Sequence, residues 1–143
     1  MCRIIHRMLI YLSTSLYTEN KMNLNNSKQR FILFGLLRII SHIANKNYQI
    51  RIWIRNQGPE CQAFDDATCD FLEIGGAIIN EFKAFNLQEN QLNKLISLYE
   101  KFQHFVDKHN MPEEFIDTPE WDAIVEMAKE VLRAFHYHQE AAE

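Results

Sequence analysis

The sequence contains few residues that break secondary structure and no long hydrophobic run. Its 143 residues include four Gly and three Pro, too few for the regular turns of an all-β sandwich. It has no run of 18 apolar residues, which excludes a transmembrane helix of the usual kind. The three Cys are an odd number without zinc or redox spacing. We therefore expect packed thiols in a cytoplasmic protein, and not a disulfide scaffold.

Catalytic and cofactor-binding motifs are also absent. The chain has no Gly-rich nucleotide-binding motif, no HExxH zinc motif and no GxSxG nucleophile motif. Its six His include no set at the spacing of zinc ligands. A carboxylate pair for acid–base chemistry can be drawn in any chain with 19 Asp and Glu, so such a pair is weak evidence. We therefore expect no enzymatic activity, no cofactor and no metal site.

Hydrophobic periodicity predicts helices through most of the chain. The expected elements are a helix capped by Ser27 and running to about residue 45, an amphipathic helix over 64–85, a regular helix over 92–106, a short turn at 113–117, and a last helix that starts at Thr118-Pro119-Glu120. The 27–45 helix is apolar nearly all round, which is typical of a central helix. These features predict an all-α fold, a compact single-domain bundle of five or six helices.

Two segments do not fit this pattern directly. Residues 48–55 read YQIRIWIR, an alternation that locally favours a strand. The only candidate partner strand is the segment 4–12, so we favour a short helix and keep a strand-like segment as the alternative. Residues 1–21 resemble a signal peptide weakly and lack a cleavage site. We interpret them as an upstream extension or mobile arm before one domain at 22–143.

Charge is segregated along the chain, although the net charge is only −4. Residues 1–59 hold nine Lys or Arg and one acid, whereas residues 60–143 hold six Lys or Arg and eighteen acids. Lys and Arg are absent from 56–82 and again from 109–128. This segregation indicates an anionic docking face for a cationic partner, because complementary charge speeds association and fixes register. An acidic face that serves only solubility is the alternative.

We expect the docking face to consist of the acids in these two stretches, with Trp53 as an anchor. The candidate residues are Glu60, Asp65, Asp66, Asp70, Glu73, Glu113, Glu114, Asp117, Glu120, Asp122 and Trp53. Trp121 begins the apolar stripe of the last helix, so we place it in the core.

The basic half offers an alternative function. Its cations, interleaved with aromatic residues, are Lys28, Arg30, Arg38, Lys46, Arg51 and Arg55. Such a pattern is typical of nucleic-acid binding. We favour the interpretation that these cations pair with the acidic half of the same chain.

Four short motifs resemble a known family. They are IRIWI at 50–54, GPE at 58–60, FDD at 64–66 and EFIDTPEW at 114–121. Over about residues 22–137 the chain resembles immunity proteins of bacterial contact-dependent growth inhibition (CDI) systems, and most closely those paired with ribonuclease-like toxin domains. The resemblance implies a cytoplasmic, non-catalytic antitoxin. Such a protein binds one toxin C-terminal domain in a 1:1 complex and blocks its active-site cleft. It has no small-molecule, nucleic-acid or membrane partner.

Overall fold

Helices dominate the part of the chain that this computed structural model describes, residues 22–138, and no strand occurs within that range. The prediction of an all-α fold is therefore confirmed. The elements are α2 (Met22–Ile43), α3 (Lys46–Tyr48), the π-helical segment η1 (Gln49–Ile54), α4 (Phe64–Asn80), α5 (Glu89–Val106), α6 (Pro112–Phe115) and α7 (Pro119–Ala134). The expected arm at residues 1–21 lies outside the described residues. None of the described helices is both long enough and apolar enough to cross a bilayer.

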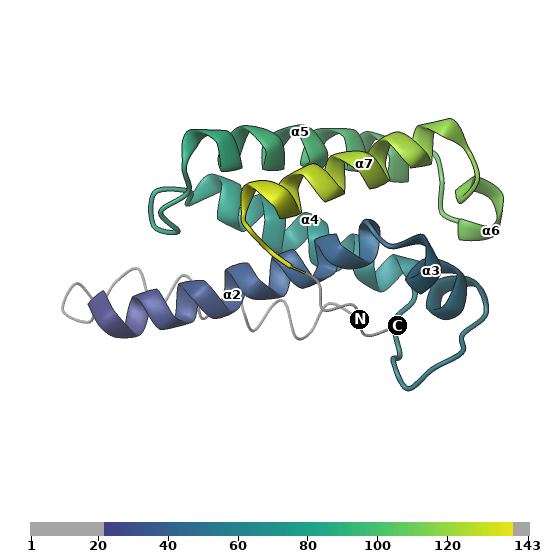
Figure 1. Cartoon of the computed structure of the whole chain (residues 1–143), viewed down its shortest axis with the longest axis horizontal. Helices are drawn as coiled ribbons and strands as arrows, with labels where there is room; N and C mark the ends of the chain where they lie inside the picture. The colour runs from purple at the N-terminus through teal and green to yellow at the C-terminus, as the bar shows by residue number, and fades with distance from the viewer. Residues whose placement is uncertain (1–21, 139–143) are drawn as a thin grey trace.

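The four long helices form an up-and-down bundle. Contacts join α2 to α4, α4 to α5, α5 to α7, and α7 back to α2, so each helix packs between two others. Successive long helices run in opposite directions, and α3 and α6 lie at one end of the bundle (Figure 1). The amphipathic stripes that periodicity predicts thus face a shared interior. In this arrangement α4 and α7 lie diagonally across the bundle from each other.

Aromatic side chains fill the core near the end that carries α6. Trp121 is completely buried, and its ring centroid lies 4.7 Å from that of Phe115, 5.3 Å from Phe105 and 6.0 Å from Phe64. Aromatic pairs at such separations contribute about 0.5–1.5 kcal/mol each beyond the area they bury. These contacts join α4, α5, α6 and α7, and they confirm that Trp121 is a core residue.

The segment 48–55 is helical, as we favoured, and not a strand. Buried residues recur in adjacent pairs, Tyr48 with Gln49 and Ile52 with Trp53, a spacing of four that suits a helix and not a strand. The backbone N–H of Arg55 donates to the carbonyl of Ile50 at 2.9 Å, the i to i+5 bond of a π-helix. Backbone groups are therefore satisfied within the segment, without a partner strand.

Three details differ from the sequence-based predictions. Helix α2 begins at Met22 and not after Ser27, because no breaker precedes Ser27. The same helix is not buried all round: Phe31 and Phe34 are 69% and 63% exposed, since α2 sits at one corner of the bundle. The expected 64–85 helix stops at Asn80, and Gly75 and Gly76 continue it without a break.

Candidate functional site

The beginnings of α4 and α7 meet the short helix α6 at one end of the bundle, which we call the acid-rich end. Phe64 begins α4, Phe115 ends α6, and Trp121 lies in the first turn of α7. The Phe64 and Phe115 ring centroids are 5.0 Å apart, and those of Phe64 and Trp121 are 6.0 Å apart. Parts of the two acid-containing stretches, far apart in sequence, therefore converge at the end that carries α6 (Figure 1).

Four of the candidate acids at this end are exposed and lack a cationic contact among residues 22–138. Asp65 lies in the first turn of α4, and Glu113 and Glu114 lie in the first turn of α6. Asp117 follows α6 and is also exposed. These four carboxylates form the part of the predicted face that is open to an incoming cation.

Three other candidate acids are engaged by side chains of the same chain. Arg51 donates two hydrogen bonds to Glu60, at 3.0 and 3.2 Å, and this guanidinium holds the pKa of Glu60 below its ordinary value.

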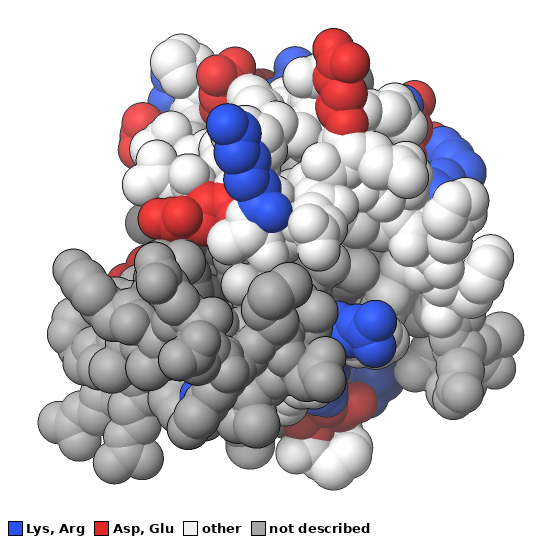
Figure 2. Space-filling model, turned by 90° about the vertical axis from the view of Figure 1, so that its left-hand side faces the viewer, with Lys and Arg blue, Asp and Glu red and all other residues white. Residues whose placement is uncertain are grey.

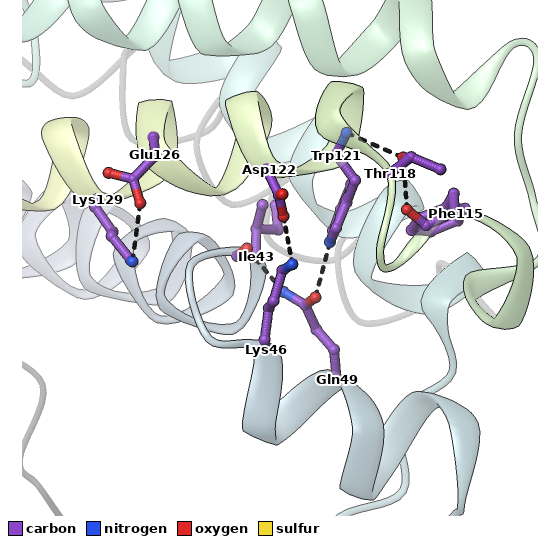
Figure 3. Close-up of polar contacts among 9 residues, drawn as sticks. All are labelled: Ile43, Lys46, Gln49, Phe115, Thr118, Trp121, Asp122, Glu126 and Lys129. Atoms are coloured by element: carbon purple, nitrogen blue, oxygen red, sulfur yellow. Dashed lines mark hydrogen bonds and ion pairs between the residues drawn. The ribbon is translucent and has the colours of Figure 1, made fainter.

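The other two engaged acids belong to α7. Lys46 forms an ion pair with Asp122 (Figure 3). His109 Nε2 lies 3.6 Å from Glu120. The prediction that the basic half pairs with the acidic half is confirmed for Lys46 with Asp122, and for the Arg51–Glu60 contact described above.

Asp66, Asp70 and Glu73 form a row along α4, and Asp70 lies on the side of that helix that faces α2. Asp66 accepts a hydrogen bond from the backbone N–H of Ala63 at 3.1 Å, so it also stabilises the start of α4. Burial, together with the Asp66 and Glu73 carboxylates, raises the pKa of Asp70 to about 6. Oε2 of Glu73 is buried and has no hydrogen-bond partner among the described residues. Within residues 22–138, no Lys or Arg forms an ion pair with this row.

The predicted face is consequently not one continuous surface. The Asp66–Asp70–Glu73 row lies on α4, whereas Asp122 lies on α7, and these helices are diagonal in the bundle. Asp65 and the acids of α6 and the start of α7 lie at the acid-rich end, whereas Asp70 and Glu73 lie two to three turns into α4. At the opposite end of the bundle, Figure 2 shows acidic and basic side chains interspersed among uncharged ones.

Trp53, the predicted anchor, lies in the core at 9% exposure. Its Nε1 donates to Gln62 Oε1 at 3.3 Å, and the Tyr48 hydroxyl donates to the same oxygen at 3.0 Å. These bonds hold the 55–63 loop against η1. In this position Trp53 packs beneath the loop that carries Glu60, and its side chain is not part of the exposed surface.

Sequence reasoning missed a groove between α2 and α4. It has a volume of about 750 Å³, and its lining includes Phe31, Phe34, Arg38, His42 and Asp70. The sequence predicts a central helix over 27–45, and hydrophobicity alone does not reveal that Phe31 and Phe34 face solvent. Burial and the Arg38 charge lower the pKa of His42 to about 4, so this ring is neutral at physiological pH.

The cysteines differ from the packed thiols that the sequence predicts. Cys61 is an exposed free thiol, whereas Cys69 is disulfide-bonded. Disulfides are uncommon in the cytosol, so the expected compartment stays a prediction. Among residues 22–138, no group of three or more His, Cys, Asp or Glu side chains is placed to hold a metal ion.

Comparisons with protein-family models, with curated proteins and with solved structures find no match to this chain, so the resemblance to CDI immunity proteins stays a prediction.

Proposed function

We propose that this protein is an immunity-type antitoxin of the cytoplasm that binds one cationic toxin domain through its acid-rich end. The observation that carries the proposal is the group of exposed carboxylates without a cationic contact in the described structure, Asp65, Glu113, Glu114 and Asp117. The resemblance in four motifs supplies the class of partner, a toxin domain with ribonuclease activity. Because enzymes that cleave nucleic acid need a basic cleft, a group of carboxylates can occupy that cleft in place of phosphates.

Helix stabilisation alone does not account for the acids at this end. Acids in a first turn interact favourably with the helix dipole, by about 0.3–1 kcal/mol each. Helix α6 has four residues and carries two acids in its only turn, with Asp117 close behind. Neighbouring like charges oppose each other by a few tenths of a kcal/mol per pair. A cationic partner removes that repulsion on binding, so the arrangement favours the complex.

The test compares two charge-reversed variants in binding to the C-terminal domain of a toxin encoded immediately upstream. One variant carries Glu113→Lys and Glu114→Lys. The control carries Glu89→Lys and Glu100→Lys, which make the same charge change at exposed positions of α5. We expect the first variant to bind about 100-fold more weakly, and the control to stay within about threefold of the parent.

The salt dependence provides a second readout. Association of the parent protein should slow steeply between 50 and 500 mM salt, because exposed charges are screened over about 10 Å at 0.1 M. Equal affinities for the two variants, or an association rate independent of salt, would remove the acid-rich end from the interface. Circular dichroism of both variants checks that the bundle is intact.

A nucleic-acid-binding function is the second candidate, because Arg30 and Arg38 are exposed on α2 beside Phe31 and Phe34. Aromatic and arginine side chains together can stack on bases. Two of the other cations of this half, Lys46 and Arg51, are held in ion pairs. A gel shift with single-stranded RNA in low salt decides between the candidates. Absence of binding below about 0.1 mM, the weak limit of non-specific affinity, would dismiss this one.

A further inference from the structure

One side of α2 presents two exposed phenylalanines at helical spacing. Phe31 and Phe34 are 69% and 63% exposed, and the next large exposed hydrophobic residue is Met111 at 47%, which precedes α6. Within residues 27–43 of α2, the exposed positions are 27, 30, 31, 34 and 38. Four of them, 27, 31, 34 and 38, recur at alternating intervals of four and three. This spacing is typical of a helix face that packs on a second, parallel helix.

The groove beside this face carries opposite charges on its two walls. Helix α2 contributes Arg30 and Arg38, and α4 contributes Asp70. Among residues 22–138, neither arginine forms an ion pair, and no Lys or Arg forms one with Asp70. A partner of a single charge sign would be repelled by one of the two walls. An identical surface, brought up by a two-fold rotation, instead sets each cationic wall against an acidic wall.

We propose that a second copy of this chain packs on the α2–α4 groove and forms a symmetric dimer, with its two-fold axis parallel to α2. The α2 helix of each copy lies in the groove of the other. Phe31 and Phe34 of the two copies pack together at the centre, and Arg38 of each copy lies against Asp70 of the other.

The helix register brings these two charges to nearly the same level. Helices α2 and α4 are antiparallel (Figure 1), and a Cβ placed on Gly75 would lie 3.7 Å from the Leu36 side chain. Asp70, five residues before Gly75, therefore lies at the level of about residue 41 of α2. In a two-fold dimer with parallel α2 helices, Arg38 of one copy lies at the level of residue 38 of the other. The two levels differ by about 5 Å, which an extended Arg side chain covers.

The dimer surface is separate from the surface that carries the proposed function. The four exposed acids of the acid-rich end do not line the groove, so each copy in the dimer keeps its own acid-rich end for a toxin domain. The groove follows α2 from Ser27 to His42, a distance of about 22 Å at the helical rise. An interface of this length is at the small end of specific interfaces, so we expect a dimer of micromolar affinity.

Sedimentation velocity of the full 143-residue chain, from about 1 to 300 µM, tests the proposal. Buffers without reductant keep the disulfide at Cys69 of α4 intact. We expect a reversible shift from monomer to dimer. The variant with Phe31→Ala and Phe34→Ala should dimerise at least about tenfold more weakly. The control Met111→Ala, an exposed hydrophobic residue outside the groove, should dimerise like the parent. Because all three side chains are exposed, the bundle should fold in every variant, which circular dichroism checks.

A charge swap between copies tests the proposed pairing. Arg38→Glu alone and Asp70→Lys alone should each dimerise at least about tenfold more weakly, because like charges then face each other across the two-fold axis. A mixture of these two variants should form a heterodimer, since each new charge then meets an opposite charge. This rescue would not occur if either substitution acted by disturbing its own bundle.

Four results would overturn the proposal. They are a monomer throughout the concentration range, a dimer that the phenylalanine variant leaves unchanged, failure of the two charge variants to form a heterodimer, and a dimer that stays covalent on a non-reducing gel, which would be a disulfide of the exposed Cys61. The phenylalanine variant should still bind the toxin domain. If it instead lost toxin binding and kept the self-association of the parent, the toxin would be the occupant of the groove.

Discussion

At the scale of single residues, Gln49 connects three elements through one buried side chain. Its Nε2 donates to the carbonyls of His42 and Ile43 at 2.9 and 2.8 Å, and its Oε1 accepts from Nε1 of Trp121 at 2.9 Å. Figure 3 shows the side chain reaching from η1 toward α7. Gln49 is completely buried, so these bonds satisfy groups that water cannot reach.

Gln49→Leu should therefore lower the free energy of unfolding by about 3 kcal/mol. The substitution leaves the Trp121 N–H and at least one α2 carbonyl unsatisfied, and each such group costs about 1–3 kcal/mol. Gln103→Leu, at an exposed position of α5, is the control and should change stability by less than about 0.5 kcal/mol. Urea denaturation measures both. A similar loss of unfolding free energy in the two variants would show that the Gln49 hydrogen bonds do not stabilise the fold.

Asp70 makes the stability of the protein depend on pH. Its pKa is raised from 3.8 to about 6 in the folded protein, so between these values the folded state binds more protons than the unfolded state. The free energy of unfolding therefore falls as pH rises through this window. At pH 7 the ionised Asp70 carboxylate lowers the free energy of unfolding. Below pH 3.8 the group is protonated in both the folded and the unfolded state, so this effect disappears.

Asp70→Asn removes this penalty and should stabilise the protein at pH 7 by about 1 kcal/mol. The full shift corresponds to roughly 3 kcal/mol, reduced because the carboxyl is only partly buried and solvent screens it. The gain should shrink toward zero as pH approaches 4. Asp65→Asn, in the same helix but exposed, should show no such gain. Urea denaturation at several pH values measures these gains. A gain from Asp70→Asn that is the same at pH 4 and at pH 7 would contradict the mechanism.

At the scale of elements, two glycines set how closely α4 and α5 approach. A Cβ placed on Gly76 would lie 3.0 Å from the Tyr99 hydroxyl, and one on Gly75 would lie 3.3 Å from the Tyr99 ring. That hydroxyl donates to the carbonyl of Leu72 at 3.1 Å. The Gly-Gly pair makes room for the Tyr99 side chain of the neighbouring helix.

A double-mutant cycle tests this role. Gly76→Ala should destabilise the parent protein by about 1 kcal/mol, because the new methyl group displaces the Tyr99 hydroxyl. In a Tyr99→Phe background the clash is absent, and the same change should stabilise by up to about 1 kcal/mol through helix propensity. Urea denaturation of the four proteins gives the coupling energy. Additive effects would show that Gly76 and Tyr99 do not interact.

At the scale of the whole molecule, one aromatic cluster around Trp121 joins the long helices of the bundle to η1 and α6 at the acid-rich end. Trp121 has ring contacts with residues of η1, α4, α5 and α6, including Trp53 at 6.3 Å and Phe102 at 6.3 Å. The cluster therefore joins helices that carry the acid-rich end to those that form the rest of the core. We expect these parts to unfold together.

Trp121→Ala should lower the free energy of unfolding by about 4 kcal/mol, the usual cost of removing a buried Trp side chain. Trp121→Phe keeps most of the ring contacts and should cost clearly less. Denaturation followed by circular dichroism and by the fluorescence of the remaining Trp53 should give coincident transitions. A fluorescence transition at lower urea than the circular dichroism transition would mean that the end of the bundle unfolds separately.

Local sequence patterns were sufficient for the fold class and for much of the core. The stripes of α5 and α7 have a clear period near 3.6, and Thr118 caps α7 as its sequence predicts, accepting from the Trp121 N–H at 3.3 Å. Segment 48–55 was ambiguous because its sequence is too short to distinguish two patterns. One is the alternation of apolar and polar residues that favours a strand, and the other is a repeat of buried residues every four positions that favours a helix. The absence of a partner strand correctly favoured a helix there.

The candidate site was only partly predictable. Two stretches of the sequence contain acids and no Lys or Arg. The structure brings the beginning of α4, α6 and the beginning of α7 to one end of the bundle, whereas the rest of α4 runs away from that end. Sequence did not show that Glu60 and Asp122 meet Arg51 and Lys46, because those contacts join separate elements. Nor did it show the groove, which exists because Phe31 and Phe34 lie on the corner of α2 that no neighbouring helix covers.

The sequence by itself determined that the chain is helical, which side of α5 and α7 is apolar, and that its charges are segregated. Only the tertiary structure decided which acids are paired, which remain open, and which hydrophobic residues of α2 reach the surface. The physical reason is that hydrophobic periodicity shows only which side of a helix is apolar and will face the interior. Pairing and exposure depend on which other helix lies next to it, and that follows from the packing of the bundle as a whole.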